Sequence, residues 1–182
     1  MNRYNKFSCA WMLPLLIFVS QVIHAQQSCN TTVSINFPQI SLCDIEPNRN
    51  SINLSLTTPV EAGLPLTSSS VNNSKWLNYT CAVAGSSTNA ITVQSNSNIS
   101  GLNLQVTASA YTGIGAGTNG ISNGVQPIST TARSVVSGIR NCYTGNGAGN
   151  GHQLNYSLGI GNHSTLHSTS YSITIIYTMI SQ

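Results

Sequence analysis

The sequence predicts an all-β fold: a single antiparallel β-sandwich, immunoglobulin-like, with about seven or eight strands. Apolar residues recur at every second position in most segments, and Ser, Thr and Asn fill the positions between them. Glycine and asparagine gather between these alternating runs, and charged residues make up only 5% of the 182 residues. Alternation with period two is typical of strands that bury one face, and short strands separated by turn residues favour a sandwich.

The alternating runs place the expected strands along the chain. They are Val33–Phe37, Ile40–Ile45, Ile52–Leu56, Leu77–Val83, Ile91–Val93, Leu102–Ala110, Leu154–Ile160 and Tyr171–Met179. Pro38 separates the first two runs, because proline cannot donate a ladder hydrogen bond. The last run carries Ile176 and Ile180 on its second face, which predicts a strand buried on both faces or paired centrally.

Three segments between these runs have other patterns. Residues 132–139 follow helical spacing after Ser129, Thr130 and Thr131, but Val135, Val136 and Gly138 weaken a helix. A short helix and another strand both remain open there. Residues 113–124 and 145–151 are rich in glycine and asparagine, which tolerate positive φ, so flexible surface connections are expected.

The N-terminus has the three parts of a secretion signal. Arg3 and Lys6 are followed by an apolar core at residues 10–19 and by a small residue, Ala25, at the expected cleavage point. The apolar core is shorter than the roughly 20 residues that a membrane span needs. We therefore expect a signal peptide at residues 1–25 and one secreted domain at residues 26–182. The product would pass through the periplasm to the cell surface or the medium, with no membrane span after cleavage.

Few charges remain after such a cleavage. Four cations (Arg49, Lys75, Arg133, Arg140) and three acids (Asp44, Glu46, Glu61) give 4 − 3 = +1. A basic patch cannot be built from four scattered cations, so nucleic acid and anionic membrane surfaces are poor partners.

The cysteine count is even in the expected mature chain: Cys29, Cys43, Cys81 and Cys142. Disulfides persist in oxidising compartments, so two bonds are expected, and four cysteines allow three pairings. The preferred pairing is Cys29–Cys43 with Cys81–Cys142, because the first closes a short loop and the second joins distant strands. No C-x-x-C pair occurs, which argues against zinc.

The acids do not form a recognisable catalytic set. Asp44 and Glu46 share a face of one expected strand, but neighbours on one strand lack the geometry of paired catalytic carboxylates, which flank a bond from separate elements. Glu61 is isolated between Pro59 and Pro65 and is expected in a loop. We therefore expect no catalytic residues, no cofactor and no enzyme activity.

The histidines give only a weak metal signal. His163 and His167 are four positions apart, a spacing that chelates metals on a helix but leaves about 13 Å between residues of a strand. A shared ion would require His152 to fold back onto them. We expect no metal site.

The layout resembles the pilin-like subunits of chaperone–usher systems, especially the spore-coat protein U branch. The matching features are the signal peptide, Cys29, the alternating segment Val33–Phe37 and the terminal strand 171–181. Segments 76–80 and 141–145 also resemble parts of uncharacterised secreted proteins of Gram-negative bacteria. Many pilin-like subunits carry an aromatic residue almost at the C-terminus, whereas here Tyr177 is followed by five more residues.

The resemblance implies assembly by strand donation, in which one subunit's extended segment completes its neighbour's sandwich. The expected donor lies around Thr32–Phe37, and the expected partners are identical or related subunits and a periplasmic chaperone and usher. The sequence therefore predicts an exported structural or adhesive surface protein. The alternative is a self-contained secreted binding module, lectin-like or ice-binding, whose neutral hydroxyl-rich faces contact a glycan or ordered water.

Overall fold

The computed structural model describes residues 27–68 and 70–182, so the expected signal peptide lies outside the described residues. The chain divides into two compact units, Met1–Asn36 and Phe37–Gln182. In the first unit, the described residues 27–36 belong to no helix or strand and are exposed to solvent. All the strands of the described residues lie in the second unit.

The second unit is an all-β, antiparallel sandwich, which confirms the predicted fold class. Its long strands, of seven residues or more, are β1 (Ile40–Glu46), β4 (Val71–Ala82), β5 (Asn89–Ser95), β6 (Leu102–Ala108), β10 (Arg133–Tyr143), β11 (His152–Ile160) and β12 (Ile175–Ser181). The shorter strands are β2 (Leu56–Thr57), β3 (Thr67–Ser68), β7 (Ala116–Thr118), β8 (Ile121–Ser122) and β9 (Val125–Pro127). A single 3₁₀ turn, η1 (His163–Thr165), is the one helical element in the described part of the chain.

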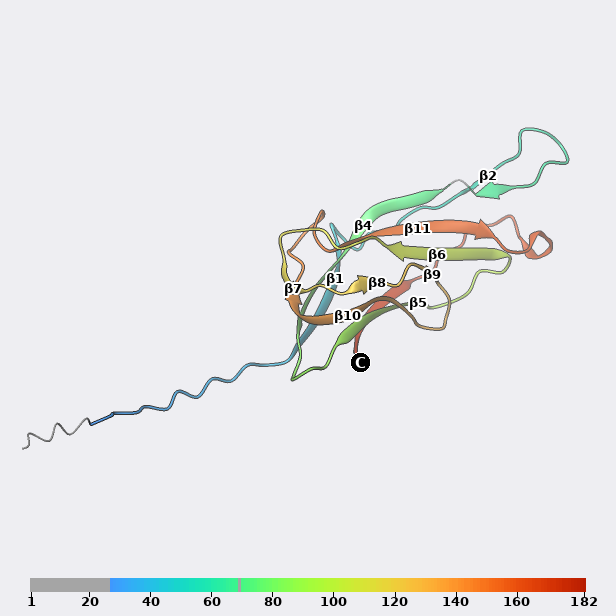
Figure 1. Ribbon diagram of the computed structural model, residues 1–182. Helices are drawn as coiled ribbons and strands as arrows, with labels where there is room; N and C mark the ends of the chain where they lie inside the picture. The colour runs from blue at the N-terminus through green and yellow to red at the C-terminus, as the bar shows by residue number, and fades with distance from the viewer. Residues whose placement is uncertain (1–26, 69) are drawn as a thin grey trace, which may run out of the picture. The chain divides into compact units, whose positions relative to one another are not determined.

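Two layers can be followed through the pairing. One contains β1, β4, β11, β6 and β9 in that order, and the other contains β12, β5 and β10. Figure 1 shows β4, β11 and β6 together in one layer, with β5 and β10 in the other. Strand β10 belongs to both layers, because its last residues, Cys142 and Tyr143, pair with β4. Strand β10 contains Gly138, at φ +71°, and two register shifts in its pairing with β5, before it reaches β4.

The core lies between the layers and is built from the inward-facing positions of the alternating runs. Its fully buried members include Leu77 on β4, Ile91 on β5, Val106 on β6 and Leu154 on β11. Each residue comes from a run in which the sequence predicted one buried face. Burial of this apolar surface is the main favourable contribution to folding.

Several expected strands differ from the structure. Val33–Phe37 and most of Ile52–Leu56 form no ladder, although Ile52 and Leu54 still pack against the core through their alternating side chains. The last strand begins at Ile175 instead of Tyr171. Its outer residues Ile176 and Ile180 are 39% and 41% exposed, so the expectation of burial on both faces is wrong.

The segment at residues 132–139, whose sequence is compatible with a helix or a strand, forms part of strand β10 from Arg133 onward. The first glycine-rich segment is also more ordered than a flexible connection, because its β7 and β8 pair with β10. In this segment glycine is needed where two backbone segments lie too close together for a Cβ atom, as well as at turns. A Cβ on Gly115 would lie 1.9 Å from the Tyr143 carbonyl oxygen.

Replacing Gly151 by Ala is expected to destabilise the domain strongly. The added Cβ would lie 2.1 Å from the Leu77 carbonyl oxygen, in a backbone conformation with φ +83°. Gly147 is the matched control, because its φ is +89° but nothing lies within 4 Å of an added Cβ. Gly147→Ala should cost about 1–2 kcal/mol from its conformation alone, and Gly151→Ala about 2 kcal/mol or more beyond that. Equal urea midpoints for the two variants would contradict the steric argument.

Candidate functional site

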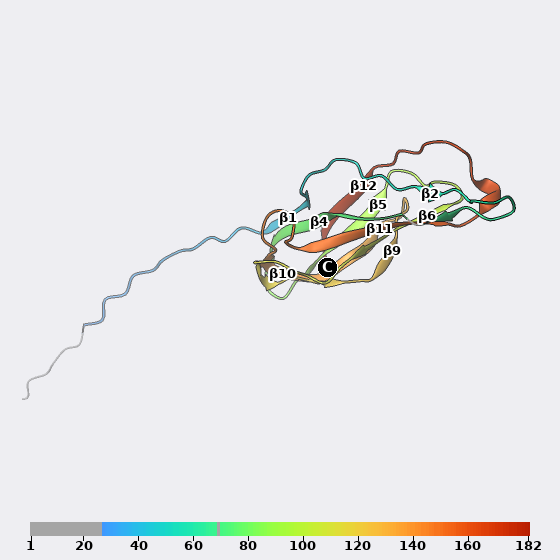
Figure 2. The same cartoon turned by 90° about the horizontal axis from the view of Figure 1, so that it is seen from above.

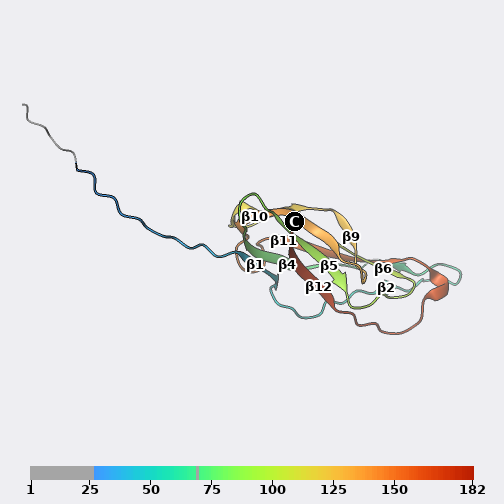
Figure 3. The same ribbon diagram turned by 90° about the horizontal axis from the view of Figure 1, so that it is seen from below.

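A groove of about 1500 Å³ runs between β1 and β12, within the second unit. Two irregular stretches complete its walls, residues 49–56 and residues 166–174. Figures 2 and 3 show β12 beside β5. Strand β1 belongs to the other layer, because it pairs with β4. The aliphatic side chains along the groove are Ile45, Ile52, Leu54, Leu56, Leu66, Leu77, Ile99, Leu102, Leu104, Leu158, Leu166, Ile173 and Ile175.

Both strands that border the groove have one free edge. Among the described residues, β12 pairs only with β5 and β1 pairs only with β4. A free edge presents a row of N–H and C=O groups that a further strand can pair with. The groove thus combines two elements that an added strand needs: a backbone ladder and pockets for every second side chain.

Two tyrosines connect the layers inside the groove. The hydroxyl of Tyr156 on β11 lies 2.8 Å from the hydroxyl of Tyr177 on β12. Burial raises the pKa of Tyr156 to about 12 and also raises the pKa of Tyr177, so both stay neutral. The groove therefore carries no phenolate.

Lys75 is a buried cation in the groove wall, 6% exposed. It lies on the inward face of β4 two residues before Leu77, where the alternation calls for an apolar residue. Its Nζ donates to the Asn48 carbonyl oxygen at 2.9 Å and to Asn48 Oδ1 at 2.8 Å. A buried ammonium requires such acceptors, so the loop after β1 is held against β4 by this charge.

The three acids of the described residues lie on β1 and in the connection between β2 and β3. Asp44 Oδ1 accepts from Arg49, with 2.8 Å to its Nη2 atom, and this guanidinium holds the pKa of Asp44 below its usual value. Asp44 and Glu46 do share one face of β1, opposite Asn78 and Trp76, as the sequence predicted. Glu61 lies exposed in the connection between β2 and β3.

The three histidines of the described residues are not brought together by the fold. His152 begins β11 and is fully buried, whereas His163 and His167 line the groove near η1. Within the described residues, no three side chains of His, Cys, Asp or Glu are placed to hold a metal ion.

His152 belongs to a buried polar network. Its Nδ1 donates to the Ser109 carbonyl oxygen at 2.7 Å, so its Nε2 accepts from the Tyr79 hydroxyl at 2.9 Å. The Tyr79 ring stacks on the imidazole and Tyr111 meets it edge-on. The surroundings hold the ring neutral, and burial lowers the pKa of His152 below its usual 6.5.

This network makes stability depend on pH. The unfolded chain protonates His152 near pH 6.5, while the folded chain resists protonation to a lower pH. The free energy of unfolding should therefore be constant above that value and fall as pH drops below it, by up to about 1.4 kcal/mol per pH unit. Urea unfolding between pH 7 and pH 5 measures the slope. His152→Gln should abolish the slope and His163→Gln should keep it; a flat wild-type profile would contradict this assignment.

The N-terminal segment, residues 27–39, has no ladder partner among the described residues. Its apolar side chains alternate along one face, and they are among the most exposed of the chain: Val33 74%, Ile35 87% and Phe37 77%. The intervening residues are Ser34 and Asn36, and residues 27–38 carry no charged side chain. Contiguous exposed apolar surface is typical of protein interaction sites.

The four cysteines described by the structure carry free thiols, so neither expected disulfide is present. Cys81 on β4 and Cys142 on β10 are nevertheless direct register partners. Cys29 is exposed in the N-terminal segment, and Cys43 is half-buried on β1 at the groove. Burial raises the pKa of the Cys43 thiol, and a hydrogen bond with the Met179 backbone partly offsets this effect.

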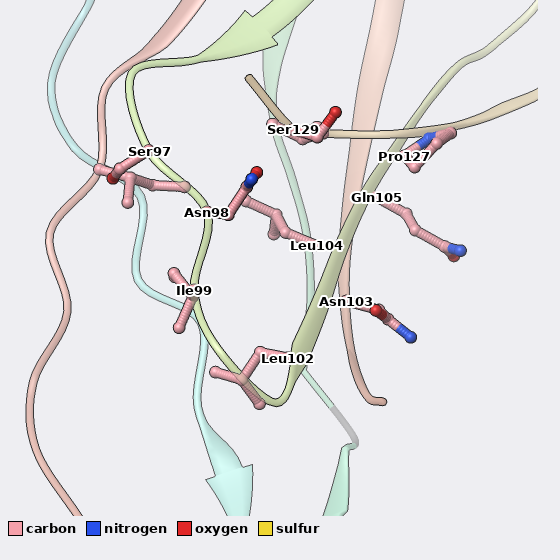
Figure 4. Close-up of a pocket in the computed structure, with 11 residues that line it drawn as sticks. Ser97, Asn98, Ile99, Leu102, Asn103, Leu104, Gln105, Pro127 and Ser129 are labelled. Atoms are coloured by element: carbon pink, nitrogen blue, oxygen red, sulfur yellow. The ribbon is translucent and has the colours of Figure 1, made fainter. Parts of the chain in front are cut away.

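A smaller pocket of about 470 Å³ adjoins one end of the groove and shares Ile99, Leu102, Leu104 and Ile173 with it. Figure 4 shows Asn103 and Gln105 on one side of β6, and Ile99 and Leu102 on the other side of the view. No aromatic side chain lines this pocket. Its polar groups are neutral amides and hydroxyls.

No family model, curated protein or solved structure matches this chain. The described residues include no apolar helix of membrane-spanning length.

Two features of the groove cannot be predicted from the sequence: the hydrogen-bond acceptors of Lys75 and the free strand edges. Pattern alone places Lys75 on the inward face of a strand, but it cannot supply the Asn48 acceptors that make this burial possible. The free edges of β1 and β12 depend on which strands pair, and alternation carries no information about pairing partners.

Proposed function

We propose that this chain is an exported structural or adhesive surface subunit that assembles by strand donation, without catalysis. The groove between the free edges of β1 and β12 is the observation that carries the proposal. The N-terminal segment around Thr32–Phe37 is the donor, and the groove of a neighbouring copy is its acceptor.

Complementarity between donor and groove supports the assignment. The donor presents exposed apolar side chains at every second residue, and the groove offers apolar pockets along a free strand edge. An uncharged donor suits a groove whose Lys75 ammonium is already bound by Asn48. Main-chain hydrogen bonds would supply affinity, and the alternate side chains would supply specificity.

The exposed groove and its free strand edges are also the reason for proposing a chaperone and an usher as partners. A free edge beside an apolar groove is an aggregation hazard until it is covered. We therefore infer that a periplasmic chaperone covers the groove before a neighbouring subunit does, and that an usher directs assembly at the outer surface.

The test is to express the mature chain, residues 26–182, in an oxidising periplasm and measure its assembly state. Strand donation predicts ladders that resist detergent without heating, or a chain that folds only with a chaperone. A soluble monomer with a single cooperative unfolding transition, even at high concentration, would contradict the proposal and favour a self-contained domain.

A second candidate function is a self-contained binding module for a glycan or surface ligand. The pocket beside β6 supports it, because Asn98, Asn103 and Gln105 offer neutral donors and acceptors around an apolar floor (Figure 4). The absence of an aromatic residue for stacking makes it the weaker candidate. A glycan array and an ice-recrystallisation assay that both stay blank would remove it.

A further inference from the structure

We propose that oxidation links Cys29 of one copy to Cys43 of the next, so that a disulfide locks each donated segment into its acceptor groove. This inference rests on the proposed strand donation, and it replaces the expected bond within one chain by a bond between chains. Its basis is the placement of the two thiols relative to donor and groove.

Cys29 continues the apolar face of the donor, three residues before Thr32. Counting in steps of two from Phe37 through Ile35 and Val33 leads to Thr31 and then to Cys29. Successive side chains of a strand point to opposite sides, so the face that enters the groove also carries the Cys29 thiol. Cys29 is exposed, which leaves it free to react.

Cys43 lies at the matching end of the groove. It faces the interior from β1, packs against the core and is close to the backbone of Met179 on β12. A donor that runs antiparallel to β12 brings its N-terminal end to this position. When Val33 lies opposite Ile175, Ile35 lies opposite Ile173 and Cys29 lies opposite Met179, because in an antiparallel pair each step forward along one strand matches a step back along the other.

The geometry of neighbouring strands suits the bond. In this register the Cα atom of Cys29 lies about 4.5–5.5 Å from that of Met179. The Cys43 thiol is hydrogen-bonded with the backbone of the same Met179, so both thiols lie beside one residue of β12. The other two thiols, Cys81 and Cys142, face each other across β4 and β10 of one copy. They leave Cys29 and Cys43 as the remaining pair.

The reaction needs an oxidant, which we identify as a disulfide compound such as oxidised glutathione or a disulfide-donating protein. The exposed Cys29 thiolate attacks the oxidant's disulfide and releases one thiol. The Cys43 thiolate of the neighbouring copy then attacks the mixed disulfide, forms the Cys29–Cys43 bond and releases the second thiol. Two protein thiols are oxidised and one disulfide of the oxidant is reduced to two thiols, which carry the two protons that the protein thiols lose.

Isotope mixing tests the bond directly. Mature chains labelled with ¹⁴N and ¹⁵N are mixed under reducing conditions, assembled, oxidised with glutathione disulfide and analysed by peptide mass spectrometry. The expected product is a Cys29–Cys43 peptide pair with one light and one heavy half. Pairs that are only light–light or heavy–heavy would place the bond within one chain and overturn the inference.

Single variants add a directional control. A mixture of Cys29→Ser and Cys43→Ser chains should give one linked dimer that withstands boiling without reductant, whereas either variant alone should give none. Detergent-resistant ladders that form before oxidation but yield no Cys29–Cys43 link would overturn this inference and leave strand donation standing. The absence of ladders and of links would overturn both.

Discussion

Replacing Ile35 by Asp is expected to abolish assembly while leaving the folded domain intact. Ile35 is 87% exposed in the single chain, so the substitution removes no packing within the domain. In the donated state its carboxylate would enter an apolar groove, and burying an unpaired charge costs several kcal/mol. We expect detergent-resistant ladders to fall by more than about 100-fold, with no change in the urea midpoint of the monomer.

Ser34→Asp is the matched control for this prediction. It adds the same charge one residue away, on the face of the donor that points out of the groove. Assembly should remain within a few-fold of the wild type, because a charge that stays exposed keeps its hydration and loses little free energy. If the two variants assemble equally well, the segment is not a strand whose alternate side chains fill a groove.

The fold class was predictable because alternation reports burial directly. Leu77, Tyr79 and Cys81 were placed on one face by their spacing, and all three are buried in the core. The same pattern misplaced Val33–Phe37, since a segment with strand character forms a ladder only when a partner edge is available. Within the described residues this segment has none, and it is therefore the segment that we propose as the donor.

The candidate site was less predictable from the sequence, because it is defined by two strand edges that have no partner among the described residues. Ile176 and Ile180 suggested a central strand, yet among the described residues β12 pairs on one side only, and both residues are partly exposed. The identity of a neighbouring strand depends on contacts between residues far apart in the sequence. His152 shows the same limit, since its burial depends on Tyr79, which lies 73 positions earlier in the chain.

Oxidation of Cys81 and Cys142 is expected to give the largest change in stability within one chain. The two residues are directly opposed in the antiparallel pair of β4 and β10, at the place where β10 passes from one layer to the other. Burial raises the pKa of Cys142 to about 11, so its thiol reacts slowly in the folded state. The bond is therefore expected to form during folding, before these strands close over it.

Such a bond would close a loop of about 60 residues and stabilise the domain by about 4 kcal/mol. Urea unfolding of the oxidised chain with and without reductant measures this difference, and Cys81→Ser should unfold at the same midpoint under both conditions. Cys29→Ser is the matched control, because the exposed Cys29 closes no loop between these strands, and it should keep the full effect of reductant on the monomer. A wild-type midpoint that reductant leaves unchanged would mean that the two thiols face each other without bonding, and the passage of β10 between the layers would then rely on its hydrogen bonds and packing alone.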